Sequence, residues 1–195
     1  MIVLFTSIFS TISIIEDRRE GFLQSVLVAP VSRGAIVMGK ILGGSLIAFI
    51  QGLLFLLMAP SLGIQIHLVQ AGFLCMILLG IAFALTGLGF VIAWKMNSTQ
   101  GFHSVMNLFL MPMWLLSGSL FPVNGAAGGL RFLMKLNPLT YGVSAFRHIL
   151  LADNFPLEVA SLPICLAVVA LFALGMFALG WWVALKRQKA DSSPT

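Results

Sequence analysis

Charged side chains are scarce in this sequence. Asp, Glu, Lys and Arg make up only 9% of its 195 residues, whereas Ala, Val, Ile, Leu, Met, Phe, Trp, Tyr and Cys make up 59%. A soluble globular protein has about 25% charged and about 45–50% apolar residues. The chain therefore has too little polar surface for a water-soluble fold, and its composition predicts an exterior that mostly faces lipid.

The sequence also lacks the patterns of a nucleic-acid-binding, disulfide-rich or metal-binding protein. Its net charge of +5 comes from few basic residues, which flank apolar runs instead of forming a stripe with aromatics between them. We therefore expect them to face lipid headgroups and not nucleic acid. The two cysteines, Cys75 and Cys165, lie inside apolar runs, so we predict neither a disulfide framework nor a metal site.

What the sequence does contain is apolar runs long enough to cross a bilayer, which needs roughly 20 helical residues. No charged residue occurs from Ile41 to Trp94 or from Val159 to Leu185. Because barrel-type alternation is missing, we predict an all-α integral membrane protein. One run contains Pro112, and we expect a kink there. The four predicted spans are 41–59, 71–94, 105–121 and 159–185.

The first apolar segment, 1–15, is too short for a full span. It leads directly into the charged residues Glu16 to Glu20, which are typical of the point where a helix leaves a membrane. We interpret it as a partial span, the second part of a helix whose beginning is missing, and expect an N-terminally truncated chain.

The distribution of Lys and Arg predicts the orientation. Alternating spans place segments 16–40 and 186–195 on one side, predicted to be cytoplasmic, and segment 122–158 on the outside. Turn residues divide the outer segment into two expected interfacial helices, Leu130–Leu136 and Leu139–Leu151. The side predicted to be cytoplasmic would hold Arg18, Arg19, Arg33, Lys40, Lys95, Lys186, Arg187 and Lys189, and the outer side Arg131, Lys135 and Arg147.

The segment from Glu16 to Val31 predicts a short amphipathic helix beside the membrane. Mixed charges are followed by apolar residues at helical spacing, and Pro30 ends the pattern. Such a helix either rests in lipid headgroups or forms a docking surface for a soluble partner. The candidate residues are Glu16, Asp17, Arg18, Arg19, Glu20, Gly21, Phe22, Leu23, Val26 and Leu27.

Two weak motifs do not support enzymatic chemistry, and we predict no catalytic residue. Residues Gly34 to Lys40 match a phosphate-binding loop except that Ile41 replaces the Ser or Thr that would hold magnesium. Ser117-Gly118-Ser119 resembles part of a hydrolase site, but a serine nucleophile needs a nearby base. We expect His67, His103 and His148 to lie on different loops outside the spans.

Small and polar residues within the spans have two interpretations each. Small residues at helical spacing predict close helix packing or a moving or dimerising interface. In and just before the first full span they are Gly39, Gly43, Gly44, Ala48 and Gly52, and in the next span Gly80 and Ala84 repeat the pattern. Gln51, Thr86 and Asn107 would form interhelical hydrogen bonds or contact a transported molecule.

Two longer motifs resemble the permease subunits of ABC-2 type exporters. The first is Glu-Asp-Arg-Arg-Glu-Gly-Phe-Leu-Gln-Ser-Val-Leu-Val-Ala-Pro-Val-Ser-Arg, from Glu16 to Arg33, followed by Gly39-Lys40 at the start of a span. The second is Asn137-Pro138-Leu139-Thr140-Tyr141, with Arg147 downstream. The resemblance covers essentially the whole chain, including the order of its spans.

The resemblance implies six spans per subunit, two permease subunits (a homodimer or close paralogues) and two separate ATPase subunits in a bacterial inner membrane. Residues Glu16 to Leu27 would be the coupling element that contacts the ATPase, and Leu130–Leu151 the outer helices. This chain would bind no cofactor, since ATP and magnesium belong to the partner.

The expected function is export of an amphipathic drug, lipid or glycan. A non-transporting membrane scaffold is the alternative. An ion-coupled carrier is disfavoured, because the spans lack ionisable residues.

Overall fold

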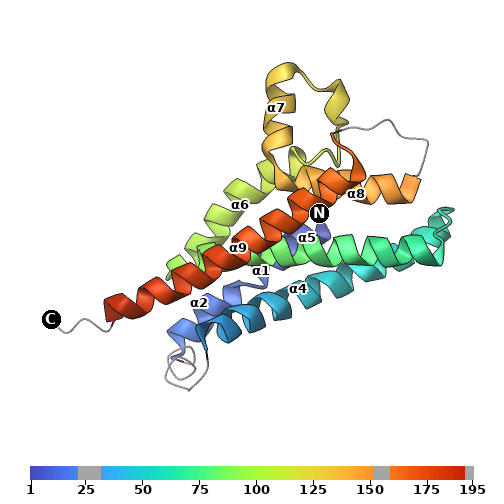
Figure 1. Cartoon of the computed structure of the whole chain (residues 1–195). Helices are drawn as coiled ribbons and strands as arrows, with labels where there is room; N and C mark the ends of the chain where they lie inside the picture. Colours follow the sequence, from blue (N-terminus) through green and yellow to red (C-terminus); the bar gives the residue numbers. More distant parts are fainter. Residues whose placement is uncertain (22–31, 152–158, 192–195) are drawn as a thin grey trace.

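The computed structural model describes residues 1–21, 32–151 and 159–191, and the secondary structure in this part is helical (Figure 1). An all-α fold is therefore confirmed for the described residues. The elements are α1 (Ile2–Phe9), α2 (Ile12–Arg19), α4 (Arg33–Leu57), η1 (Ala59–Leu62), α5 (Leu68–Lys95), α6 (Thr99–Leu115), η2 (Val123–Gly125), α7 (Gly128–Leu136), α8 (Pro138–Leu151) and α9 (Leu162–Asp191).

Helix α5 is the centre of the bundle. It packs against α1, α2, α4, α8 and α9. Half of its most apolar 18-residue window is buried, compared with 28% of the corresponding window in α4 and 11% in α9. The exposed side chains of α4 and α9 are largely apolar, as expected where lipid and not water is the solvent.

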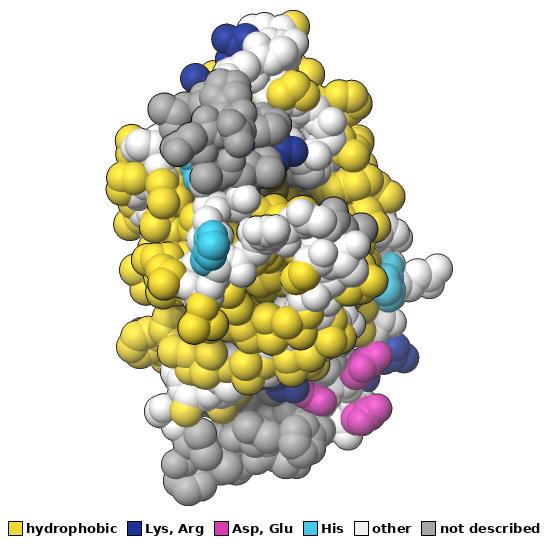
Figure 2. All heavy atoms as spheres, turned by 90° about the vertical axis from the view of Figure 1, so that its right-hand side faces the viewer, with side chains coloured by type: hydrophobic (Ala, Val, Ile, Leu, Met, Phe, Trp, Pro, Cys, Tyr) yellow, Lys and Arg dark blue, Asp and Glu magenta, His cyan; other side chains and the backbone are white. Residues whose placement is uncertain are grey.

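The ends of the helices gather at two opposite poles. Helices α2, α5 and α9 end, and α4 and α6 begin, at one pole, which we call the basic end and define by Asp17, Arg18, Lys40, Lys95 and Lys186. Helices α7 and α8 lie together at the other pole (Figure 1). Figure 2 shows a broad apolar band between charged residues at the two poles.

In the described part, three segments are long and apolar enough to cross a membrane: Arg33–Ser61, Leu68–Lys95 and Leu162–Lys186. Helix α6 has 17 residues, and the first apolar segment forms two helices of eight residues each. Four full spans plus a partial one therefore stays a prediction.

Several helices begin or end outside the predicted spans, and side-chain caps set some of these ends. The hydroxyl of Ser32 accepts a hydrogen bond from the Ala35 N–H at 3.3 Å, so α4 begins at Arg33 and residues 33–40 are helical instead of part of a loop. At the other pole, His67 and Gln70 form a capping box that starts α5 at Leu68. Helix α9 continues to Asp191, into the predicted tail. Serine caps of this kind satisfy N–H groups that have no partner within the helix.

The predicted span 105–121 is displaced in the structure. Ser98 accepts from the Gly101 N–H at 3.2 Å, and α6 therefore starts at Thr99. The helix includes His103, so the prediction that this residue lies on a loop is wrong. The helix ends at Leu115, because Ser117 binds the Trp114 carbonyl at 2.6 Å and Gly118 has a φ of 79°. A left-handed residue of this kind cannot continue a right-handed helix.

The first apolar segment is broken between α1 and α2. The hydroxyls of Ser10 and Thr11 donate to the carbonyls of Ser7 and Ile8 at 2.8 and 2.6 Å. Hydroxyl groups that bind nearby carbonyls compete with the helical hydrogen bonds and bend helices. The charged residues from Glu16 to Arg19 then continue α2 beyond the predicted boundary at Ile15.

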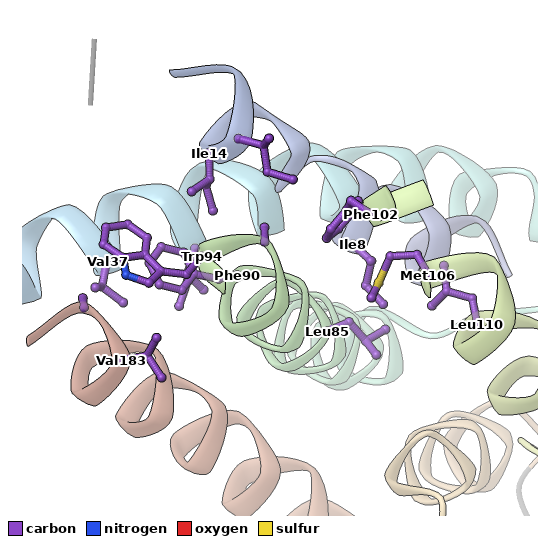
Figure 3. Close-up of a cluster of buried hydrophobic side chains, with 14 of the residues drawn as sticks. Ile8, Ile14, Val37, Leu85, Phe90, Trp94, Phe102, Met106, Leu110 and Val183 are labelled. Atoms are coloured by element: carbon purple, nitrogen blue, oxygen red, sulfur yellow. The ribbon is translucent and has the colours of Figure 1, made fainter. Parts of the chain in front are cut away.

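A single large apolar cluster joins most of the bundle (Figure 3). Ile8, Phe90 and Phe102 are completely buried in it and come from α1, α5 and α6. Val37 of α4 and Val183 of α9 extend the cluster toward the basic end. Close packing of these side chains fixes the positions of helices that lipid alone would not hold together.

Gly89 allows α5 to approach the break in the first segment. A Cβ added at Gly89 would lie 2.8 Å from the Thr11 hydroxyl and 3.1 Å from the Ile8 Cα atom. A backbone atom cannot swing away as a flexible side chain can. By contrast, Gly72 of the same helix is exposed and has no atom within 4 Å of an added Cβ.

We therefore predict opposite effects for the same substitution at these two glycines. Gly89→Ala should lower the free energy of unfolding by about 1–3 kcal/mol through overpacking. Gly72→Ala should leave it unchanged or raise it by up to about 1 kcal/mol, because alanine favours the helix. Thermal unfolding in detergent measures both variants, and equal stability of the two would contradict the close approach.

Candidate functional site

The predicted coupling element lies at the end of α2. Glu16, Asp17, Arg18 and Arg19 form its last turn, and Gly21, with a φ of 80°, follows the C-cap residue Glu20. Glycine in this conformation is a common helix stop. The prediction of one helix from Glu16 to Val31 is therefore wrong, because its first residues belong to α2 and that helix stops before Gly21. The apolar residues assigned to the same element, Phe22, Leu23, Val26 and Leu27, lie outside the described residues.

An ion pair joins α2 to α4 at this point. The Lys40 ammonium donates to the Asp17 carboxylate, and both side chains are partly buried. Glu16, Arg19 and Glu20 are exposed on the same turn. An exposed ion pair contributes little to stability, but partial burial weakens its screening by water and salt. The pair therefore fixes the start of α4 relative to the end of α2.

Arg18 joins the same turn to the end of α5. Its guanidinium donates to the carbonyls of Trp94 and Met96 at 2.8 and 2.9 Å and to the Asn97 side-chain oxygen at 3.3 Å. It also lies 5.6 Å from the centre of the Trp94 ring. The last carbonyls of a helix lack partners within it and carry partial negative charge. A charged donor therefore satisfies groups that would otherwise be costly near lipid.

Together these contacts connect three helices around the segment 22–31. The chain enters this segment from α2 and leaves it into α4, and the Asp17–Lys40 pair links the two sides. Arg18 links the end of α2 to the short connection between α5 and α6, through its bonds to the Trp94 and Met96 carbonyls. The Asp17–Lys40 pair and the Arg18 hydrogen bonds thus link α2, α4 and the α5–α6 connection to one another.

The second predicted motif forms a junction at the opposite pole. The Asn137 amide donates to the Met113 carbonyl in the last turn of α6 at 2.6 Å. Its oxygen accepts from the Leu139 N–H at 3.0 Å. Asn137 thereby caps the start of α8 and the end of α6 at the same time. Pro138 follows as the first residue of α8, where its missing N–H costs nothing.

Three further side chains of this motif donate to carbonyls at helix ends or in the turn after α6. The Thr140 hydroxyl lies 2.7 Å from the Met134 carbonyl and 3.1 Å from that of Leu116. The Tyr141 hydroxyl donates to the Lys135 carbonyl at 3.0 Å. Arg147 donates to the Ser119 carbonyl at 3.1 Å. We call Asn137, Thr140, Tyr141 and Arg147 the carbonyl clamp, because all four bind carbonyls at the ends of α6 and α7 or in the turn after α6.

Thr140 was missing from the predicted site residues, although it is 1% exposed and central to the carbonyl clamp. The sequence does indicate that Thr140 could act as a hydrogen-bond donor. A hydroxyl near the start of a helix that follows two other helix ends can supply a donor where water is scarce. The identity of its acceptors depends on the tertiary fold, so the sequence could suggest the donor and not its partners.

The three polar residues predicted within the spans have different surroundings. Gln51 of α4 accepts from the Thr6 hydroxyl of α1, which is the expected interhelical bond. Thr86 is buried and donates to the Ala82 carbonyl of its own helix at 2.8 Å. Asn107 is exposed on α6. A role of any of them in contacting a transported molecule stays a prediction.

The serine and histidine candidates have separate partners in the structure. Ser117 pairs with Ser119 and the Trp114 carbonyl, whereas His148 contacts the Ala160 carbonyl. Across residues 1–21, 32–151 and 159–191, no three His, Cys, Asp or Glu side chains come together as metal ligands. At both poles, the polar side chains of the two motifs connect the ends of different helices.

A comparison with protein families finds a match that covers both predicted motifs. The family described as ABC-2 type transporter matches residues 1–151, which include the end of α2 and the carbonyl clamp. The match ends at the last residue of α8, before α9.

Individual relatives have similar descriptions. The chain is 30% identical over 158 residues to the putative transport permease ycf38 of Cyanophora paradoxa, covering 76% of this chain and 53% of the relative. It is 28% identical over 152 residues to the probable multidrug ABC transporter permease YbhR of Escherichia coli (strain K12), covering 75% and 40%.

A third relative is the inner membrane transport permease YhhJ of the same organism, which is 27% identical over 154 residues, covering 76% of this chain and 40% of the relative. In these alignments the chain spans about half or less of each relative's length.

The geometry of the clamp predicts a specific effect of Asn137→Asp. An aspartate retains the acceptor for the Leu139 N–H but cannot donate to the Met113 carbonyl when ionised. We expect a loss of about 1–3 kcal/mol in the free energy of unfolding, because a partly buried carbonyl loses its donor. Thermal unfolding in detergent measures this loss.

Gln65→Glu is the matched control, since Gln65 is exposed in the connection before α5 at the same pole. It should change the unfolding temperature little. Equal shifts for the two variants would show that the negative charge, and not the lost donor, is responsible.

Proposed function

The chain belongs to the ABC-2 type transporter family, and from this premise we propose that it is the membrane-spanning permease subunit of an ATP-binding cassette exporter. In this proposal ATP and magnesium are bound by a separate ATPase subunit, and the permease responds to ATP binding there. A second permease subunit, either an identical chain or a close paralogue, completes the translocation path. One relative is named an inner membrane transport permease, which supports the bacterial inner membrane as the location.

The observation that carries the proposal is the network of contacts at the basic end. Residues Glu16 to Leu27 would contact the ATPase subunit, with Phe22 and Leu23 as the apolar part of the surface. Within this segment, the exposed charges of Glu16, Arg19 and Glu20 would set the specificity of docking.

Displacement of the coupling element would spread through side-chain contacts that are already in place. Asp17 and Lys40 transmit it between α2 and α4, and Arg18 transmits it to the end of α5. Tightly packed helices respond to such a displacement as rigid bodies with discrete arrangements. The carbonyl clamp at the other pole would keep α6, α7 and α8 together during this motion.

An amphipathic molecule is the class of substrate that fits the composition best. One relative is named a probable multidrug ABC transporter permease. The described bundle has a broad apolar exterior and few intramembrane polar groups, of which Gln51 and Asn107 are exposed. A drug, lipid or lipid-linked glycan would move along the interface between two permeases without needing a charged pocket.

Replacing Phe22 and Leu23 by aspartate tests the coupling role. We expect the double variant to lose co-purification with the ATPase subunit, because two charges would enter an apolar contact. Phe132→Asp with Leu133→Asp is a matched control, since this adjacent pair is exposed on α7 at the opposite pole. The control should retain the ATPase subunit.

Reconstitution of the wild-type complex separates an exporter from a scaffold. An exporter should hydrolyse ATP faster when its substrate is present, and the Phe22/Leu23 variant should not. Unchanged association and hydrolysis in that variant would remove the coupling role from the segment. A complex that never responds to any amphipathic substrate would favour the scaffold instead.

A further inference from the structure

A groove at the basic end borders the proposed coupling route, and Trp94 belongs to both. It has a volume of about 430 Å³ and lies between the ends of α5 and α9. Trp94 and Lys95 line it from α5, and Trp182, Val183 and Lys186 line it from α9. The groove therefore combines two ammonium groups with two large aromatic rings at the level where both helices reach the edge of the apolar band.

The chemistry of the groove favours an anion. None of the described residues that line it is acidic. The Lys186 ammonium lies 3.8 Å from the centre of the Trp182 ring, a cation–π arrangement that holds the charge beside the groove. On the other wall, the Trp94 ring stacks on Phe90 with 5.2 Å between the ring centres, so this wall is rigid.

The surroundings indicate that the anion carries an apolar chain. Trp182 is about half exposed, and α9 presents further exposed leucines along its length toward the opposite pole, namely Leu171, Leu174 and Leu179. An acyl chain could lie along this surface of α9 while its headgroup remains in the groove. Tryptophan beside lysine at the end of a spanning helix is the composition found at the headgroup level of a membrane.

We propose that this groove binds an anionic phospholipid, with Lys95 and Lys186 holding the phosphate and Trp182 lying against the start of an acyl chain. The proposal rests on the lining of the groove and does not depend on the proposed function. A lipid bound here would bridge α5 and α9, which are the central helix and the most lipid-exposed of the long helices.

Quenching of tryptophan fluorescence by brominated lipids tests the proposal directly. The full chain is reconstituted in phosphatidylcholine bilayers that contain increasing fractions of brominated phosphatidylglycerol or, in parallel, brominated phosphatidylcholine. We expect half-maximal quenching at a lower mole fraction of the anionic lipid. Lys95→Gln with Lys186→Gln should reduce this preference roughly tenfold or more, because each basic residue adds to the attraction.

Arg131→Gln with Lys135→Gln is the matched control, since it removes the same net charge from two exposed residues of α7 at the opposite pole. The control should keep the preference for phosphatidylglycerol. Equal quenching by the two lipids in the wild-type chain, or equal loss in both double variants, would overturn the site.

A third arm separates a lipid headgroup from a free anion. Inorganic phosphate, added at millimolar concentration with chloride adjusted to constant ionic strength, should leave the preference unchanged because it provides no acyl chain. Loss of the preference in phosphate would assign the groove to a free anion and overturn the assignment to lipid.

Discussion

The side chains of one helical turn hold the basic end of this protein together. Asp17 pairs with Lys40, and Arg18 donates to the Trp94 and Met96 carbonyls at the end of α5. Without them, α2, α4 and α5 would be related at this end mainly by the apolar packing of the buried cluster. The proposed response to an ATPase subunit depends on these polar contacts, since they make the three helix ends move together.

The opposite pole follows the same physical rule with different residues. A helix that ends near lipid exposes carbonyls that water cannot easily satisfy. At the basic end Arg18 supplies the donor, and at the other pole the carbonyl clamp supplies four, led by Asn137 and Thr140. Both family motifs thus place donors beside helix ends. This explains why polar residues recur in a chain that is otherwise so poor in them.

The sequence predicts the broad architecture because the bilayer imposes a simple requirement of length and polarity. The charge-free stretch from Ile41 to Trp94 was enough to predict two spans, and α4 and α5 cover most of it. The ends of α6 were misplaced because local capping decides them: Ser98 starts the helix earlier, and Ser117 with Gly118 ends it earlier. Each of these bonds joins residues that are three positions apart, so local sequence could have predicted both ends of α6.

Other features could not be predicted from local sequence. Arg18 and the Trp94 carbonyl are 76 positions apart, and only the path of the chain brings them together. Likewise, the sequence marks Gly89 as a small residue but does not show that the backbone at Ile8 passes close to it. The donors and small residues are visible in the sequence, whereas their partners depend on tertiary structure.

A charge exchange between Asp17 and Lys40 tests most directly whether the ends of α2 and α4 must be linked. ATP-driven transport is measured in proteoliposomes for Asp17→Lys, Lys40→Asp and the double exchange, each with the ATPase subunit bound. The account predicts that each single variant loses most transport while retaining the ATPase subunit, and that the double variant recovers much of it. Normal transport in both single variants would contradict the account, because the two helix ends would then not need the pair to move together.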